Sequence, residues 1–405
     1  MADAQLTEID KMKNIKITVV RAFVLDQTGS GGDYHDREKG HYLVDTLIAT
    51  PMSSYPEYKN SRTSFGINVM KSIVVEVEAS DGTVGISAGQ GGEPACYMIE
   101  KHFKRFLVGQ DPRQLNQFWD QMYRASLYYG VKGVPLWAIS TVDIALWDLL
   151  GLLRQEPVYQ MIGGKTRDQI ELYCTGIRPD IAQKAGFIGG KMPLTHGPSD
   201  RRDGVKANVK YFQEMREKVG PDFLLMADCW MALDVTYATE LAYAMRDLDL
   251  YWMEEVLHPD DFDGHKELKD RVPWMRWTTG EHQYTRYGFR ELIKSRSVDI
   301  LQPDVMWCGG LTELLRISAM AAAYDIPVVP HGSGAYSYHF VVTQPHCPFC
   351  EYLNTSPDCK SFPPVFGKMF INEQVPVKGK IFPSNEPGWG LKLNRKGLNL
   401  IRPYQ

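Results

Sequence analysis

Hydrophobic and polar residues alternate along two stretches near the start of the chain, at 16–25 and 70–79. Alternation with a period of two is typical of a strand that buries one face. The Asp81-Gly82 pair after the second stretch is typical of a tight hairpin turn. We therefore expect a returning strand at 83–87, paired with the strand before it.

Helical periodicity replaces this alternation from about 96 to 162. Its clearest stretch, 134–153, is expected to bury one broad apolar face. The Gly163-Gly164 pair is a typical signal for the end of a helix. Strands followed by helices predict an α+β domain over residues 1–162. The loop at 26–69 carries many Tyr and His residues, and a loop of that length is usually functional.

Short apolar runs and helical stretches alternate from residue 168 onward. The runs predict strands at 169–175, 187–192, 223–228, 250–255, 276–281, 298–304, 326–331 and 348–353. The stretches between them predict helices at 204–219, 235–247, 285–296 and 310–324. This alternation indicates a parallel α/β barrel over residues 163–354. No clear amphipathic helix follows the last run, and the tail at 355–405 is expected to return to the first domain.

Composition and charge narrow the classes of function. The chain has 45 basic and 49 acidic residues, a net charge of −4, which is not the footprint of a nucleic-acid-binding protein. No run approaches about 18 apolar residues, so we expect no contact with a membrane. The 7 cysteines are scattered and no secretory signal is visible, so we expect a reduced, cytoplasmic compartment.

Ionisable residues stand at the ends of successive predicted barrel strands. In a parallel barrel these ends meet at one mouth, where catalysis takes place. The residues are Asp228, Glu254 with Glu255 beside it, Glu281, Asp304, His331 and Glu351.

Three of these carboxylates, Asp228, Glu254 and Glu281, offer hard oxygen ligands from three neighbouring strands. Such a set suits Mg²⁺, which also keeps coordination positions for water or substrate oxygens. The alternative is that each carboxylate caps a helix or accepts backbone hydrogen bonds. The regular spacing of one βα unit favours the metal site.

Asp304 and His331 end consecutive predicted strands, as in a carboxylate–imidazole pair that acts as a general base. A structural histidine is the alternative. Glu351 follows on the next strand and is a candidate general acid or hydrogen-bonding group, or a structural carboxylate.

The segments that carry these residues, "MADCW", "YWMEE", "TTGEH", "LQPD" and "VVPHG", resemble the enolase superfamily in its mandelate racemase-like branch. The resemblance implies a modified TIM barrel, (β/α)7β, with an N-terminal α+β capping domain, and it explains the missing last helix. Within that branch the chain is most similar to the L-rhamnonate dehydratase family, on segments such as "GGDYHD" at 31–36 and "QPDVMWCGGLT" at 302–312.

The resemblance implies a Mg²⁺-dependent hydro-lyase that removes the C2 proton and then the 3-hydroxyl of an acid sugar such as L-rhamnonate. It assigns the metal to Asp228, Glu254 and Glu281, the base to His331 with Asp304 as partner, and an acid or substrate-bonding role to Glu351. It places His35 and Arg62 of the capping domain on the substrate. It leaves open whether His331 or Glu351 protonates the leaving hydroxyl.

One departure from that branch affects the reaction. Many relatives carry Lys-x-Lys on the second barrel strand, whereas this chain reads Lys191-Met192-Pro193. Proline cannot act as a second base, which disfavours racemisation by two bases. Lys191 remains as a candidate that binds the substrate carboxylate or is structural.

Three other interpretations stay open. The first is a dehydratase or epimerase for a different aldonate. The second is a metal-dependent hydrolase, and the third is a non-catalytic binding protein that kept the barrel. The resemblance further implies a homo-oligomer, such as an octamer, with a small-molecule acid sugar as its partner.

Overall fold

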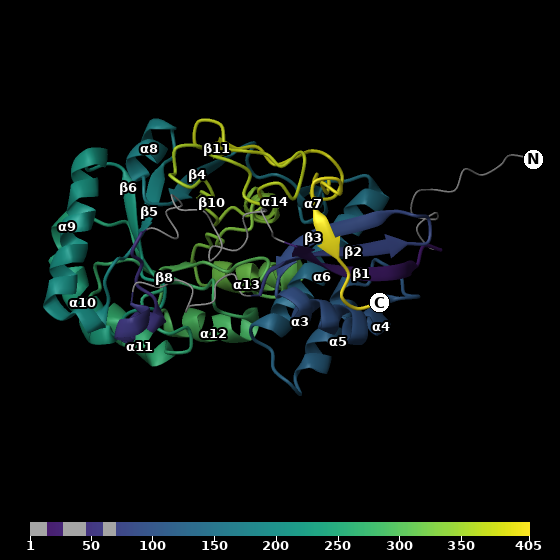
Figure 1. The fold of residues 1–405 in the computed structure, drawn as a ribbon, viewed down its shortest axis with the longest axis horizontal. Helices are drawn as coiled ribbons and strands as arrows, with labels where there is room; N and C mark the ends of the chain where they lie inside the picture. The colour runs from purple at the N-terminus through teal and green to yellow at the C-terminus, as the bar shows by residue number, and fades with distance from the viewer. Residues whose placement is uncertain (1–13, 27–45, 60–69) are drawn as a thin grey trace, which may run out of the picture.

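Two sheets organise the chain (Figure 1). The structure is a computed structural model that describes residues 14–26, 46–59 and 70–405. The smaller sheet has the strand order β12-β1-β2-β3, and all its pairings are antiparallel. Its strands are β1 (Ile17–Asp26), β2 (Ser72–Ala79), β3 (Val84–Gln90) and β12 (Asn399–Ile401).

The predicted hairpin joins β2 to β3. Glu78 pairs with Val84, and the chain turns through Asp81 and Gly82 between them. Gly82 takes a φ of 89°, where a residue without Cβ is favoured. The Asp81 carboxylate accepts the backbone N–H of Thr83 at 3.0 Å and so fixes the turn. The prediction of this hairpin is confirmed.

Helices follow the first three strands, as the periodicity predicts. Near the sheet lie the helices α3 (Gly92–Tyr97), α4 (Lys104–Leu107), α5 (Leu115–Ser126), α6 (Val134–Arg154) and α7 (Val158–Met161). Two short 3-10 helices, Pro51–Ser54 and Pro56–Tyr58, lie instead beside the barrel, where the hydroxyl of Ser199 donates to the carbonyl of Ser53 at 2.9 Å. A π-helical turn at Met98–Phe103 connects α3 to α4.

Helix α6 corrects the expectation of a single buried face. It is buried nearly all round, because β3 packs on one side of it and a helix of the barrel packs on another. The approach to β3 is close: a Cβ on Gly85 would lie 2.4 Å from the backbone of Leu149, and one on Gly89 would lie 2.0 Å from Thr141 Oγ1. Glycine is therefore required at both positions.

The larger sheet is parallel and curled, with the order β10-β4-β5-β6-β7-β8-β9. Its strands are β4 (Ile170–Thr175), β5 (Gly189–Pro193), β6 (Leu224–Asp228), β7 (Met253–Glu254), β8 (Trp277–Thr279), β9 (Ile300–Leu301) and β10 (Cys350–Leu353). The segment 328–331 continues the sheet beyond β9 through parallel bridges to Leu301 and Asp304. Val329 of this segment packs with Phe349 inside the sheet, which brings it towards β10.

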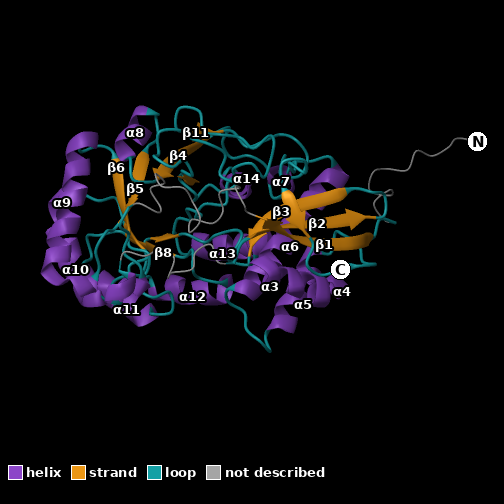
Figure 2. Cartoon of the chain, viewed as in Figure 1, coloured by secondary structure: helices purple, strands orange, loops and turns teal. Residues whose placement is uncertain are grey.

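Helices surround the outside of the curled sheet (Figure 2). They are α8 (Pro179–Lys184), α9 (Arg201–Val219), α10 (Val235–Ala244), α11 (Phe262–Arg271), α12 (Thr285–Ser295), α13 (Gly310–Ala322) and α14 (Ala335–Val341), with 3-10 turns at Pro198–Asp200 and Arg246–Leu248. Helix α11 is absent from the sequence-based assignment, because its segment is strongly polar and buries only Gly264, His265 and Leu268.

The tail after β10 contains no helix in the described residues, as expected. It touches both sheets: β11 (Lys380–Ile381) pairs with β4, and β12 pairs with β1. Trp389 of the tail donates its indole N–H to the carbonyl of Ile144 on α6 at 2.9 Å. The division into domains at 162 and 354 stays a prediction.

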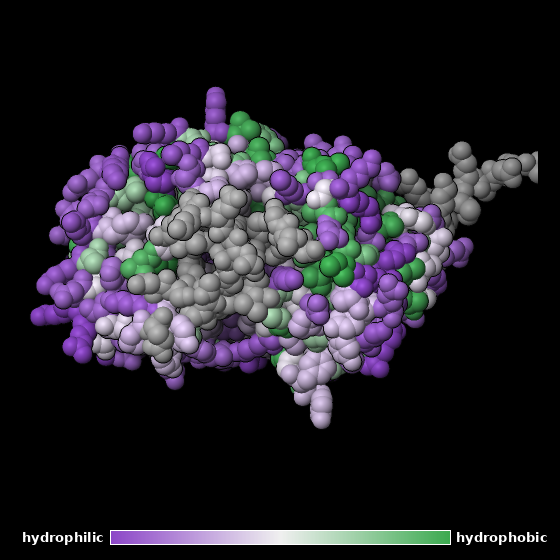
Figure 3. Space-filling view, viewed as in Figure 1, coloured by the Kyte–Doolittle hydropathy of each residue, from purple (hydrophilic) through white to green (hydrophobic). Residues whose placement is uncertain are grey.

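One described helix, α6, is long and apolar enough to cross a membrane. However, 78% of its apolar window is buried inside the molecule, which is the setting of a core helix. Hydrophilic residues cover the outer helices of the barrel instead (purple in Figure 3).

Candidate active site

The carboxyl ends of the barrel strands bring the predicted side chains together. Asp228 on β6 is in register with Glu254 on β7. Inward and outward positions alternate along these strands: Met226 and Trp252 belong to the interior cluster, whereas Leu225 and Met253 face the outer helices. The same alternation directs Asp228 and Glu254 into the barrel, above this interior cluster.

A lysine ammonium lies among these carboxylates. Lys191 on β5 is 1% exposed. Its Nζ donates to Glu254 Oε1, lies 3.1 Å from Glu351 Oε1 and lies 3.6 Å from Asp228 Oδ2. The second oxygen of Glu254 accepts the indole N–H of Trp252 at 3.1 Å and the amide of Gln302 at 2.8 Å. Glu254 is thereby held at both oxygens.

A second group of possible ligands stands beside this cluster. One ligand atom from each of Glu255, Glu281 and His282 lies within 4.8 Å of the others. His282 donates Nδ1–H to Glu255 Oε2 at 2.7 Å, and its backbone N–H donates to Glu255 Oε1 at 3.3 Å. Glu255 has a φ of 47°, so the strand alternation ends there and both glutamates of the pair contribute to the mouth.

The predicted dyad is formed. His331 donates Nδ1–H to Asp304 Oδ2 at 2.7 Å. The other carboxylate oxygen accepts the hydroxyl of Ser333 at 2.9 Å and the N–H of Met306 at 2.6 Å, so Asp304 is fixed. The free ring nitrogen of His331, Nε2, lies 3.3 Å from Glu281 Oε2, and 14% of the side chain is exposed.

An indole ring contacts both imidazoles of the site. Trp307 lies 5.3 Å, centroid to centroid, from the rings of both His282 and His331. Both histidines therefore pack on the same tryptophan, and each is hydrogen-bonded to a carboxylate.

Glu351 is bonded at both carboxylate oxygens. It accepts the hydroxyl of Thr175 and the N–H of Gly332, the latter at 2.7 Å, and it pairs with Lys191. Burial opposes its ionisation, but Lys191, His331 and these hydrogen bonds together lower the pKa of Glu351 to about 2. Glu351 is therefore an ionised acceptor at neutral pH.

For three other carboxylates of the site, burial outweighs the positive charge nearby. Burial raises the pKa of Asp228, raises that of Glu254 well above its usual range, and raises that of Glu281 to about 7. Buried carboxylates of this kind are stabilised in the ionised form by a cation. The donor set consists of hard oxygens, which fits Mg²⁺.

Burial disfavours the charged form of His331, but the carboxylates of Glu281, Glu351 and Asp304 outweigh it and raise the pKa of His331 well above its ordinary value. For His282 the same competition, dominated on the raising side by Glu255, gives a pKa of about 9.

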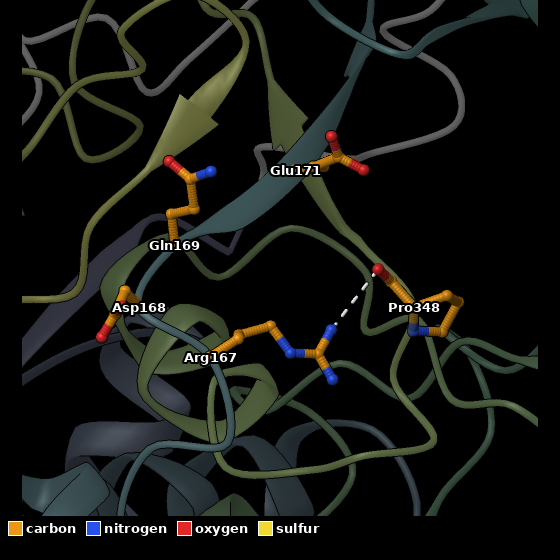
Figure 4. Close-up of a pocket in the computed structure, with 5 residues that line it drawn as sticks. All are labelled: Arg167, Asp168, Gln169, Glu171 and Pro348. Carbon is orange, nitrogen blue, oxygen red and sulfur yellow. Dashed lines mark hydrogen bonds between the residues drawn. The ribbon is translucent and has the colours of Figure 1, made fainter.

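A separate cavity of about 610 Å³ lies near the start of β4 and is lined by Arg167, Asp168, Gln169, Glu171 and Pro348. This is the amino end of the sheet, away from the cluster described above. The Arg167 guanidinium points towards Pro348 (Figure 4) and donates to the carbonyls of Cys347 at 2.6 Å and Pro348 at 3.4 Å. Those bonds anchor the segment before β10, a structural role.

Known proteins share this arrangement. Residues 180–397 match the family described as enolase C-terminal domain-like, and residues 46–163 match the N-terminal domain of mandelate racemase and muconate lactonizing enzyme. The chain belongs to the mandelate racemase and muconate lactonizing enzyme family. An L-rhamnonate dehydratase from Saccharopolyspora erythraea is 52% identical over 391 residues, which cover 96% of this chain and 99% of that protein.

Two solved structures are similar to this chain over nearly its whole length. Rhamnonate dehydratase from Gibberella zeae, complexed with Mg, is 53% identical with a TM-score of 0.92, covering 95% of this chain and 96% of that chain. The 3,6-anhydro-D-galactonate cycloisomerase from Zobellia galactanivorans is 27% identical with a TM-score of 0.75, covering 95% and 99%. The expected family and fold, a barrel with a capping domain, are confirmed.

Seven of the nine predicted site residues lie at the barrel mouth in two adjoining groups. Lys191 contacts Asp228, Glu254 and Glu351, and His331 contacts Glu281 and Asp304. Their roles stay predictions. His35 and Arg62 lie outside the described residues. Sequence reasoning did not find the Glu255–His282 pair, although both residues adjoin predicted ligands and this adjacency was the available signal.

Proposed function

We propose that this chain is an L-rhamnonate dehydratase, a Mg²⁺-dependent hydro-lyase that converts the acid sugar to its 2-keto-3-deoxy acid and water. Two relatives that bear this name, at 52% and 53% identity over nearly the whole chain, support the substrate. The observation that carries the reaction type is the His331–Asp304 dyad, whose other ring nitrogen faces Glu281 in a mouth lined by carboxylates.

The carboxylates of Asp228, Glu254 and Glu281 are the proposed metal ligands. Asp228 and Glu254 are in register on neighbouring strands, and Glu281 belongs to the adjoining group of possible ligand atoms with Glu255 and His282. Their raised pKa values and hard oxygen atoms fit a divalent cation, and the Gibberella zeae relative is complexed with Mg. Bound Mg²⁺ supplies positive charge that offsets the charge building on the substrate carboxylate when the C2 proton leaves.

His331 is the proposed base, and a divalent cation on Glu281 would offset the carboxylate charge that raises the pKa of His331 and so favour the neutral imidazole. Asp304 holds Nδ1–H, so Nε2 is the atom that takes the proton from C2. Asp304 also stabilises the imidazolium that results, because its own position is fixed by Ser333 and Met306. The proton thus moves from C2 to Nε2, and the electron pair of the C–H bond moves towards the substrate carboxylate.

The same imidazolium is the proposed acid for the leaving 3-hydroxyl. The alternative donor, Glu351, has a pKa of about 2, so at neutral pH it holds no proton to give. The C3–O bond then breaks, the hydroxyl leaves as water with the proton of His331, and the enol rearranges to the 2-keto acid. Glu351 instead accepts a hydrogen bond from the substrate.

A panel of acid sugars tests this function, with each sugar assayed for keto-acid formation in the presence of Mg²⁺ and again with excess EDTA. We expect the largest kcat/KM for L-rhamnonate and no turnover with EDTA. A better substrate of other stereochemistry would move the assignment to another aldonate dehydratase. Exchange of the C2 proton without keto-acid formation would favour an epimerase.

We further propose a homo-oligomer in the cytoplasm. All seven cysteines are free and buried, which fits a reducing compartment. The loop between α5 and α6 exposes Leu127, Tyr128 and Tyr129, the second at 97%, and large exposed apolar groups of this kind are typical of an interface. Light scattering of the purified protein tests the assembly, and a monomer at micromolar concentration would contradict it.

A further inference from the structure

The position of Lys191 assigns it a role that differs from binding the substrate. Its ammonium is 1% exposed and is enclosed by groups from four other strands. Glu254 on β7 and Asp228 on β6 lie on one side, and Glu351 on β10 lies on the other. The ring of Tyr173 on β4 lies below it, with its centroid 5.9 Å from Nζ.

The layer beneath Lys191 is dry and aromatic. Tyr173, Trp252 and Phe349 pack against one another, with ring centroids between 5.2 and 6.0 Å apart. These rings therefore shield the ammonium from solvent on that side, and carboxylates lie on two of its other sides. A charge enclosed in this way is held by its partners and in turn fixes them.

We propose that Lys191 is a positioning residue, an internal counter-cation that joins the metal-binding carboxylate of Glu254 to Glu351 and does not touch the substrate. This inference rests on the proposed metal site. Lys191 is fixed by β5, and it reaches across β6 to Glu254 and across β4 to Glu351. It thereby sets the spacing between the metal ligands and the carboxylate that faces the dyad.

Its charge acts on both ends of this bridge. The ammonium is buried between the carboxylates of Glu254 and Glu351, and their negative charges stabilise it. A positive charge that hydrogen-bonds a proposed metal ligand repels a divalent cation at the same site. Lys191 therefore weakens metal binding while it holds Glu351 in place for turnover.

Three variants test the proposal: Lys191→Met removes the charge at similar volume, Lys191→Arg keeps it, and Lys269→Met is the control. Lys269 also pairs with a barrel carboxylate, Asp299 at 2.6 Å, but near the amino ends of β8 and β9. For each protein we would measure Mn²⁺ affinity by electron paramagnetic resonance without substrate, kcat and KM for L-rhamnonate, and the unfolding midpoint in EDTA.

For Lys191→Met we expect Mn²⁺ to bind at least about threefold more tightly, kcat to fall about 100-fold, and KM to change less than about threefold. Lys191→Arg should keep the Mn²⁺ affinity of the wild type and recover about tenfold in kcat. Lys269→Met should leave all three kinetic and binding values unchanged. Opposite effects on metal affinity and kcat are expected only of a counter-cation.

Two results would overturn the proposal. A large rise in KM with kcat and Mn²⁺ affinity preserved would make Lys191 a substrate ligand. A lower unfolding midpoint with unchanged Mn²⁺ affinity in both variants would make it merely structural. If Lys191→Met does not fold, a shifted Mn²⁺ affinity in Lys191→Arg counts against the proposal. Failure of wild-type protein to dehydrate L-rhamnonate would refute the proposed function, and the Mn²⁺ measurement would still test Lys191.

Discussion

Individual side chains at the barrel mouth derive their chemistry from their neighbours. Asp304 and Glu351 are both buried carboxylates, yet Asp304 is bonded to an imidazole and Glu351 to an ammonium, a hydroxyl and an N–H group. The first arrangement suits His331 to its proposed role as base, and the second favours the ionised form of Glu351. Residue type alone does not distinguish these two acids.

Replacing His331 with Asn should lower kcat by at least about 10³-fold and abolish exchange of the C2 proton in D₂O, because His331 is the proposed base and Asp304 holds its ring so that Nε2 faces the site. Proton exchange is measured by NMR. His346→Asn is the matched control, since His346 bonds Ser318 on α13, outside the site. Exchange that persists in His331→Asn would remove His331 as the base.

Glu281→Gln should remove most of the stabilisation that Mg²⁺ gives to the folded protein. A ligand present at about 100 times its Kd stabilises the folded state by about 2.7 kcal/mol, so wild-type protein should unfold a few degrees higher with Mg²⁺ than with EDTA. The variant should show little of this difference. The exposed Glu291→Gln on α12 should behave as wild type. An unchanged Mg²⁺ effect in Glu281→Gln would contradict the three-carboxylate site.

At the scale of elements, the contact between β3 and α6 determines how the smaller sheet meets the barrel. Helix α6 packs against β3 through Gly85 and Gly89 and against α13 on another side. Asp143 of α6 accepts the hydroxyl and the N–H of Thr312 at the start of α13, at 2.5 and 2.9 Å. Helix α6 thus packs into two hydrophobic cores, which explains why it is apolar nearly all round.

Gly89→Ala should destabilise the protein by about 1–3 kcal/mol, because the added Cβ overlaps the side chain of Thr141 and α6 must move. Denaturant unfolding measures the loss. Thr141→Ala removes the two nearest atoms, so the double variant should recover part of it. Asp81→Ala, in the exposed turn before β3, is the control for a substitution next to this strand that does not touch α6. Strictly additive losses in the double variant would show that this contact is not the cause.

On the scale of the whole molecule, the C-terminal tail connects the two sheets. The tail passes β4, reaches α6 at Trp389 and finishes in the smaller sheet as β12. Asp148 of α6 accepts the N–H groups of Ile86 on β3 and of Trp389, at 2.8 and 2.9 Å. One buried carboxyl thus joins strand, helix and tail.

Stability should fall as pH rises through neutrality. Burial raises the pKa of Asp143, Asp148 and Glu373 each to about 7. A carboxyl whose pKa is raised by folding binds its proton more tightly in the folded state. Its contribution to stability is therefore complete below about pH 4 and is lost as pH rises through about 7.

Asp148→Asn should make this decline shallower, by up to about 1.4 kcal/mol per pH unit, which is the effect of one proton. The free energy of unfolding is measured between pH 5 and 8, above the range in which carboxylates with lowered pKa, such as Glu100, titrate. The exposed Asp222→Asn should leave the slope of the wild type. Equal slopes in all three proteins would exclude Asp148 as a contributor.

The order of the elements, and the set of residues expected at the barrel mouth, could be predicted from the sequence. Alternating apolar runs predicted the hairpin and the barrel strands, because burial of one face imposes a period on the chain. Acidic residues one βα unit apart predicted that Asp228, Glu254 and Glu281 meet, because parallel strands end at one mouth. These predictions depend on patterns that are local in the sequence, so they do not require knowledge of how the side chains pack.

Which atoms face one another depends on the three-dimensional fold. Glu255 enters the mouth because a left-handed φ of 47° ends the alternation, and no periodic pattern reveals a single dihedral angle. Lys191 reaches Glu254 and Glu351 across intervening strands, and their carboxylates come from segments 63 and 160 residues away in sequence. Pairings over such separations depend on how the sheet curls, which local sequence does not specify.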